Sequence, residues 1–77
     1  MLTTPQREIL GAMYFYQDLF GYDLPIRSLN NTGLAVLNTI PEQDTYLEEV
    51  QDSRGVDCLR LTVIGREIGK AEWEGLR

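Results

Sequence analysis

Apolar residues in the first part of the chain recur at helical spacing. The members of this stripe are Ile9, Leu10, Met13, Tyr16 and Phe20. Their spacing predicts a helix with one buried face. Thr3 or Thr4 can cap its start, and Pro5 suits its first turn because proline's missing amide donor is not needed there. Gly21 is the residue at which we expect this helix to end.

Two shorter helices are expected next. Pro25 opens a very short helix over residues 25–30, and the apolar residues that it turns inward are Ile26 and Leu29. Residues 30–33 have the composition of a turn. Thr32 can cap a third helix that carries the apolar stripe Leu34, Leu37 and Ile40, and Pro41 either ends this helix or begins a loop.

From residue 45 the pattern becomes that of strands. Segments 45–51 and 56–63 are rich in β-branched and aromatic residues, and the turn chemistry of residues 52–55 between them predicts a hairpin. If Arg54 and Gly55 form a two-residue turn, three pairs follow: Val50 with Leu59, Glu49 with Arg60, and Asp52 with Asp57. Alternation places Leu59, Leu61 and Val63 on one face, and Cys58, Arg60 and Thr62 on the other.

The second strand is expected to lead directly into a last helix. Thr62 can cap this helix, whose apolar residues are Ile64, Ile68 and Ala71, with Trp73 and Leu76 near its end. The pattern predicts an α+β fold with three N-terminal helices, a hairpin and a C-terminal helix. A chain of 77 residues has room for one core, so we expect a single domain over residues 1–77.

This order of elements resembles a winged helix-turn-helix domain, and two motifs strengthen the resemblance. The first resembles the opening of LexA-like repressor domains and consists of Leu2-Thr3, Gln6-Arg7-Glu8-Ile9-Leu10, Gly21-Tyr22 and Pro25-Ile26-Arg27-Ser28-Leu29. The second, Arg60-Leu61-Thr62 followed by Gly65-Arg66-Glu67, is similar to a MarR- and PadR-like pattern in which the second wing strand turns into a helix. The resemblance implies a winged-helix-like fold with a leucine buried under the wing. In DNA-binding members, the third helix and the wing carry basic and amide side chains that contact phosphates and base edges.

The charge distribution argues against DNA binding. The net charge is −5, and the segment from Glu42 to Asp57 contains six acids and one base, so this segment holds the whole excess. Residues 33–43, which cover the predicted third helix, contain no lysine or arginine. Because affinity for DNA depends on neutralising phosphates, an acidic wing beside this helix should repel a duplex.

We therefore expect a small acidic protein-binding or regulatory module that engages a basic protein surface, such as that of a nucleic-acid-binding protein. The candidate partner-binding residues are Glu48, Glu49, Asp52, Arg54 and Asp57. Small acidic proteins of this sort occur among phage-encoded inhibitors, including anti-CRISPR proteins and antirepressors. That comparison rests on size, charge and class, without a matching motif.

Two other interpretations stay open. A DNA-binding winged helix-turn-helix regulator would use Arg27, Asn30, Asn31, Thr32 and Arg54. The hairpin could instead be acidic only to stay solvated and to avoid pairing with other chains. The aromatic residues Tyr14, Phe15, Tyr16 and Phe20 allow two arrangements: Tyr16 and Phe20 in the core with a tyrosine at the surface, or an exposed patch that binds a partner.

Residues for catalysis or metal binding are scarce. The chain has no histidine, and its one cysteine, Cys58, has no imidazole partner to activate it. The acids of residues 42–57 lack the spacing of a calcium loop. We expect no enzyme activity, no metal and no cofactor. No signal-peptide pattern or membrane-length apolar run occurs, so we also expect a cytoplasmic protein with no membrane partner, as a monomer or weak homodimer.

Overall fold

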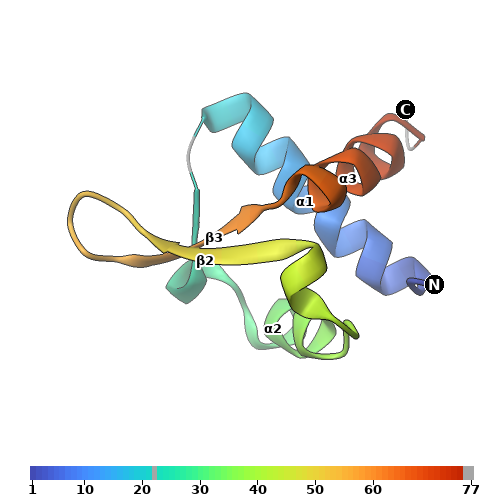
Figure 1. Ribbon diagram of the computed structural model, residues 1–77, viewed down its shortest axis with the longest axis horizontal. Helices are drawn as coiled ribbons and strands as arrows, with labels where there is room; N and C mark the ends of the chain where they lie inside the picture. The colour runs from blue at the N-terminus through green and yellow to red at the C-terminus, as the bar shows by residue number, and fades with distance from the viewer. Residues whose placement is uncertain (22, 76–77) are drawn as a thin grey trace.

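Helices and a small antiparallel sheet alternate along the chain (Figure 1). The computed structural model describes residues 1–21 and 23–75. Its elements are α1 (Thr4–Phe20), β1 (Leu24–Pro25), the 3-10 helix η1 (Ile26–Ser28), α2 (Asn31–Asn38), the 3-10 helix η2 (Gln43–Thr45), β2 (Leu47–Gln51), β3 (Asp57–Leu61) and α3 (Val63–Gly75). The strand order is β1-β3-β2, so β3 is the central strand. The α+β class is confirmed, whereas the predicted set of three N-terminal helices is not matched in detail.

The predicted ends of α1 are confirmed. The Thr3 hydroxyl accepts the Gln6 N–H at 3.4 Å, and the Gln6 side-chain oxygen accepts the Thr3 N–H at 2.8 Å. This reciprocal cap satisfies two of the amide donors that a helix start leaves unpaired. Gln6 is itself buried, and its amide nitrogen donates to Thr39 beyond the end of α2, so the cap also connects two helices. Gly21 caps the other end through its N–H to the Gln17 carbonyl.

The buried face of α1 differs from the predicted stripe. Tyr14 is only 8% exposed, whereas Phe20, expected in the core, is 52% exposed. The reason is that α3 packs closely against the Tyr14 side of α1. A Cβ at Gly69 of α3 would lie only 2.5 Å from the Leu10 carbonyl oxygen and 2.9 Å from the Tyr14 Cβ. The buried positions of α3 are accordingly glycines, Gly65 and Gly69, and the predicted apolar face fails at Ile64, which is exposed.

The very short helix predicted over residues 25–30 is matched only by the 3-10 helix Ile26–Ser28. Leu24 and Pro25 form β1, which pairs with Leu59 and Cys58 of β3, and only a short 3-10 turn follows. A residue before proline is biased towards extended backbone, which suits Leu24 to a strand, and β3 supplies an edge for it to pair with.

The predicted start of the next helix is wrong. Its cap is Asn30 rather than Thr32: the Asn30 side-chain oxygen accepts the Gly33 N–H at 2.7 Å. Residues 31–33, read as a turn, are therefore the first turn of α2. Asparagine is as good a cap as threonine, so composition alone did not separate the two positions. Leu37 of α2 is buried as expected.

The hairpin forms, but the predicted register is wrong by one residue. The Asp52 N–H donates to the Val56 carbonyl, and the Gly55 N–H donates to the Asp52 carbonyl, so three residues lie in the loop. Gly55 has φ +79°, the left-handed conformation that this loop length requires at its last position. The observed pairs are Glu48 with Arg60, Glu49 with Leu59, Val50 with Cys58 and Gln51 with Asp57.

At the junction from β3 to α3, the burial of Leu61 and the cap at Thr62 are as predicted. Leu61 is buried, at 6% exposed. The Thr62 hydroxyl accepts the Gly65 N–H at 3.1 Å, which caps α3, and donates to the Thr45 carbonyl at 2.6 Å. A Cβ at Gly65 would collide with the carbonyl of Tyr46, so glycine permits this close approach. Val63, expected at the end of the strand, is instead the exposed first residue of α3, and Leu76 lies outside the described residues.

Candidate functional site

The hairpin of β2 and β3 projects beyond the helices and carries much of the chain's acidity (Figure 1). The observed register divides its side chains between two faces, because successive residues of a strand point to opposite sides. Glu48 and Arg60 lie opposite one another on one face. Glu49 lies on the other face, which also carries Asp57 and Leu59.

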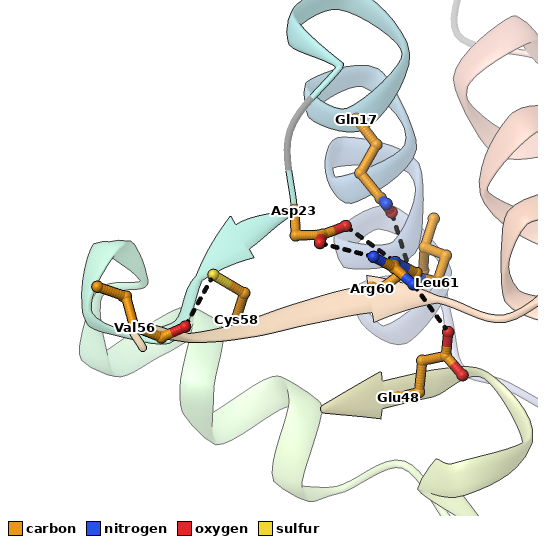
Figure 2. A network of polar contacts seen from close by, with 7 residues as sticks. All are labelled: Gln17, Asp23, Glu48, Val56, Cys58, Arg60 and Leu61. Carbon is orange, nitrogen blue, oxygen red and sulfur yellow. Dashed lines mark hydrogen bonds and ion pairs between the residues drawn. The ribbon is translucent and has the colours of Figure 1, made fainter. Parts of the chain in front are cut away.

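On the first face, acid and base neutralise one another (Figure 2). The Arg60 Nε and Nη2 atoms donate to the Asp23 carboxylate at 3.0 and 2.9 Å, and Nη1 lies 3.8 Å from Glu48. The hydrogen bonds that Arg60 donates to the Asp23 carboxylate raise the pKa of Arg60 above its ordinary value. The bidentate pair ties the segment before β1 to the central strand. Glu48 therefore contributes less free charge than the sequence indicates.

Two of the predicted site residues build the hairpin tip. The Asp52 carboxylate accepts the Arg54 N–H at 2.8 Å and the Val56 N–H at 3.0 Å, and it pairs with the Arg54 guanidinium at 3.1 Å. The hydrogen bond from Val56 is the main cause that lowers the pKa of Asp52. Asp52 is thus a turn-forming residue. The expected repulsion between Asp52 and Asp57 is absent, because the register places Gln51 opposite Asp57 and the Gln51 amide donates to it at 3.1 Å.

A second group of acids has no basic partner among the described residues. We call this group the acidic face; it consists of the exposed acids of residues 42–57 that form no ion pair, Glu42, Asp44, Glu49 and Asp57. Glu8, Glu67 and Glu74 also lack a basic partner in the described part of the chain but lie on the helices. Glu49 and Asp57 are diagonal neighbours on one side of the hairpin. Glu42 and Asp44 flank Gln43, which together with Glu49 lines a hollow of about 160 Å³ between the hairpin and α2. Glu42 and Asp44 were not among the predicted site residues, although they belong to the same charged segment.

Most of the basic side chains are already paired within the chain. Four of the six that the structure describes form ion pairs: Arg7 with Glu72, Arg54 with Asp52, Arg60 with Asp23, and Arg66 with Asp18. Arg27 and Lys70 are the described bases outside these pairs. A surface that binds phosphates needs several available cations, and the paired arginines would first have to leave their carboxylates.

The residues of the DNA-binding interpretation do not form one site. Arg27 lines a hollow beside the hairpin tip with Gly55 and Asp57, whereas Asn30 and Thr32 line a different hollow against α1. The Asn30 side-chain oxygen is occupied as a helix cap, and Arg54 is held by Asp52. The remaining candidate, Asn31, is exposed in the first turn of α2.

Cys58 lies on β3 beneath the hairpin tip and is 1% exposed. Its Sγ atom donates to the Val56 carbonyl at 3.5 Å (Figure 2), and burial raises the pKa of the thiol. A buried protonated thiol is a poor nucleophile, so this cysteine acts in packing.

Among the residues described, no group of three or more potential metal ligands comes together, and no helix has both the length and the apolar character to cross a membrane.

Comparisons with protein-family models, with curated proteins and with solved structures found no match. The case for a function therefore rests on the geometry of the chain. The acidic face groups four of the acids that have no ion pair among the described residues in the segment 42–57.

Proposed function

We propose that this chain is a small winged-helix-like binding module of the cytoplasm, a monomer or weak homodimer, whose acidic face engages a basic protein surface. The observation that carries the proposal is the separation of charge: Glu42, Asp44, Glu49 and Asp57 have no ion pair among the described residues, while four of the six described bases are neutralised internally. A partner with basic side chains would complement this face.

The internal use of Asp52 and Glu48 also supports binding over simple solvation. A hairpin kept soluble by charge needs acids anywhere on its surface. Here the acids on one face and at the tip pair with bases or turn amides of the fold, and those of the acidic face have no basic partner among the described residues. Nucleic-acid-binding proteins carry basic surfaces of the required sign. An inhibitor that covers such a surface, in the manner of antirepressors or anti-CRISPR proteins, is the specific form of the proposal.

The test is the association rate of the chain with a partner captured from its native cell, measured against ionic strength. The double variant Glu49→Gln, Asp57→Gln removes two charges from the acidic face, and Glu67→Gln, Glu74→Gln removes two exposed charges from α3 as a matched control. We expect slower association and a flatter salt dependence for the first variant only, because complementary charge acts chiefly on encounter. Equal effects of the two variants would refute the proposal.

Duplex DNA provides the opposing test. We expect no binding of mixed-sequence DNA at physiological salt, since the acidic face has the wrong sign for phosphates. Polarisation titrations measure this directly. Salt-sensitive binding that is lost in both Arg27→Ala and Asn31→Ala variants would instead favour a transcriptional regulator.

A further inference from the structure

The outer edge of β2 is an open sheet edge. Hydrogen bonds join Tyr46 to Thr62 at one end of the hairpin and Asp52 to Val56 at the other. In an antiparallel ladder, alternate residues bond to the partner strand. The even-numbered residues of β2 therefore bond to β3, and the N–H and C=O groups of the odd-numbered residues point away from the sheet.

Two residues make this edge accessible. Glu49 and Gln51 are exposed, whereas Leu47, the other odd-numbered residue, is buried at 3% exposed. No described residue forms a hydrogen bond with the outward N–H or C=O of Glu49 or Gln51. Each offers one donor and one acceptor, which is the template for an added strand.

A second copy of the chain is a poor occupant of this edge. If two β2 strands paired antiparallel about a two-fold axis, a register centred on Glu49 would place Glu49 opposite Glu49. The two neighbouring registers would place Glu48 opposite Glu48, or Glu48 opposite Asp52. Like charges directly across a ladder are destabilising, so the register centred on Glu49 is disfavoured most. The other two are disfavoured less, because Glu48 and Asp52 are paired with Arg60 and Arg54.

We propose that the open edge of β2 receives an extended basic segment of the partner as an additional antiparallel strand. This inference rests on the proposed function and specifies the partner's chemistry. A residue directly opposite Glu49 projects on the acidic face, and the next residue, opposite Glu48, projects on the other face. The segment is therefore recognised chiefly by a basic residue opposite Glu49, with β-forming residues around it. A second basic residue opposite Glu48 would share that carboxylate with Arg60 and contribute less.

The first of these basic residues is best an arginine. Glu49 borders the hollow against α2, whose other lining groups include the apolar side chains of Leu34 and Leu59 and the amides of Asn38 and Gln43. An arginine stem can lie along the two leucines while its guanidinium meets the Glu49 carboxylate and an amide oxygen. This site combines apolar contact with charge, which a lysine satisfies less well because it lacks the planar set of donors.

The probe is a short fluorescent peptide of alternating valine and threonine with two adjacent arginines at its centre. Its controls replace both arginines by glutamine, or carry one N-methyl group. Because the strands are antiparallel, the first arginine lies opposite Glu49 with its N–H directed at β2, and the second has its N–H directed to solvent. We expect N-methylation of the first arginine to weaken binding about tenfold or more, and N-methylation of the second to change it little.

Variants of the protein test the same bond from the other side. Glu49→Pro removes the outward N–H together with the charge, whereas Glu49→Gln removes the charge alone; proline is compatible with an edge strand whose N–H faces solvent. Circular dichroism and amide spectra would establish that both fold. We expect the proline variant to bind the peptide more weakly than the glutamine variant, and the Gln51 amide of the parent protein to become protected from hydrogen exchange when peptide binds.

Two results would overturn strand addition. One is no binding of the arginine peptide. The other is binding that depends on the charge of Glu49 but is equal for the two N-methyl peptides and for Glu49→Pro and Glu49→Gln. The second result would leave the acidic face as a charged docking surface, so the failure of this inference is distinguishable from failure of the proposed function.

Discussion

The two sides of the sheet differ in whether their outward-facing polar groups are satisfied within the fold. Beyond β1, the Leu61 N–H of β3 is satisfied by the Gln17 side chain at 3.1 Å, and Arg60 is held by Asp23. These contacts join α1 to the sheet and close that side (Figure 2). The outer edge of β2 has no comparable cover at Glu49 or Gln51 among the described residues. One side thus uses its polar groups within the fold, and on the other side the outward N–H and C=O groups of Glu49 and Gln51 have no hydrogen-bond partner among the described residues.

The largest difference between the two sides should appear on removal of a core side chain. Leu61→Ala, on the closed side, should lower the free energy of unfolding by about 2–5 kcal/mol, because Leu61 is buried. Val63→Ala, two residues along the chain and exposed, is the control and should change it by less than about 0.5 kcal/mol. Urea unfolding measures both. Similar values for the two variants would mean that Leu61 does not anchor the sheet.

The polar closure is tested by Gln17→Leu. This change leaves the part-buried Leu61 N–H without an acceptor, which should cost about 1–3 kcal/mol. Gln17→Glu retains an acceptor oxygen and should cost less. On the open side, Gln51→Leu loses only an exposed hydrogen bond to Asp57 and should stay within about 0.5 kcal/mol. Faster exchange of the Leu61 amide proton in Gln17→Leu, but not in Gln17→Glu or Gln51→Leu, would show that the lost stability comes from this hydrogen bond. An unchanged exchange rate in Gln17→Leu would contradict the prediction.

The sequence predicted the parts of this contrast that depend on local patterns. The boundaries of α1, the cap at Thr62 and the burial of Leu61 followed from spacing and capping chemistry. The closure by Gln17 could not be foreseen, since a single glutamine on a helix carries no sign of its distant partner. The same holds for β1, where pairing with β3 overrode the helical pattern.

The site was predicted less well than the fold, because a shift of one residue exchanges the two faces of a hairpin. With a two-residue turn, Glu49 would have met Arg60 and lost its free charge. With the observed three-residue loop, Arg60 lies opposite Glu48, and Glu49 lies opposite Leu59 without a basic partner among the described residues. Composition located the acidic segment, but only the loop geometry determined which acids remain available.

The hairpin tip should respond to acid. Hydrogen bonds keep the pKa of Asp52 below its ordinary value of 3.8, so the ionised carboxylate stabilises the fold above that pH. This contribution should be lost as the pH falls below 3.8 and through the lowered pKa. Asp52→Asn keeps an acceptor oxygen but cannot titrate there. We expect the stability advantage of the parent over this variant, followed by urea unfolding, to shrink over that range; parallel pH profiles would contradict the assignment.

The smallest effect is expected at Glu42, where stability and binding should separate. Glu42 has φ 52° and ψ 49°, the left-handed conformation that costs a non-glycine residue about 1–2 kcal/mol. Glycine relieves this strain but loses more entropy on folding, so Glu42→Gly should gain only about 0.5 kcal/mol. Glu42→Ala removes the same charge and keeps the strain, so it should gain nothing. If the acidic face serves binding, both variants should associate equally slowly with a basic partner although only one is more stable. Association that followed stability instead of charge would show that Glu42 belongs to the scaffold alone.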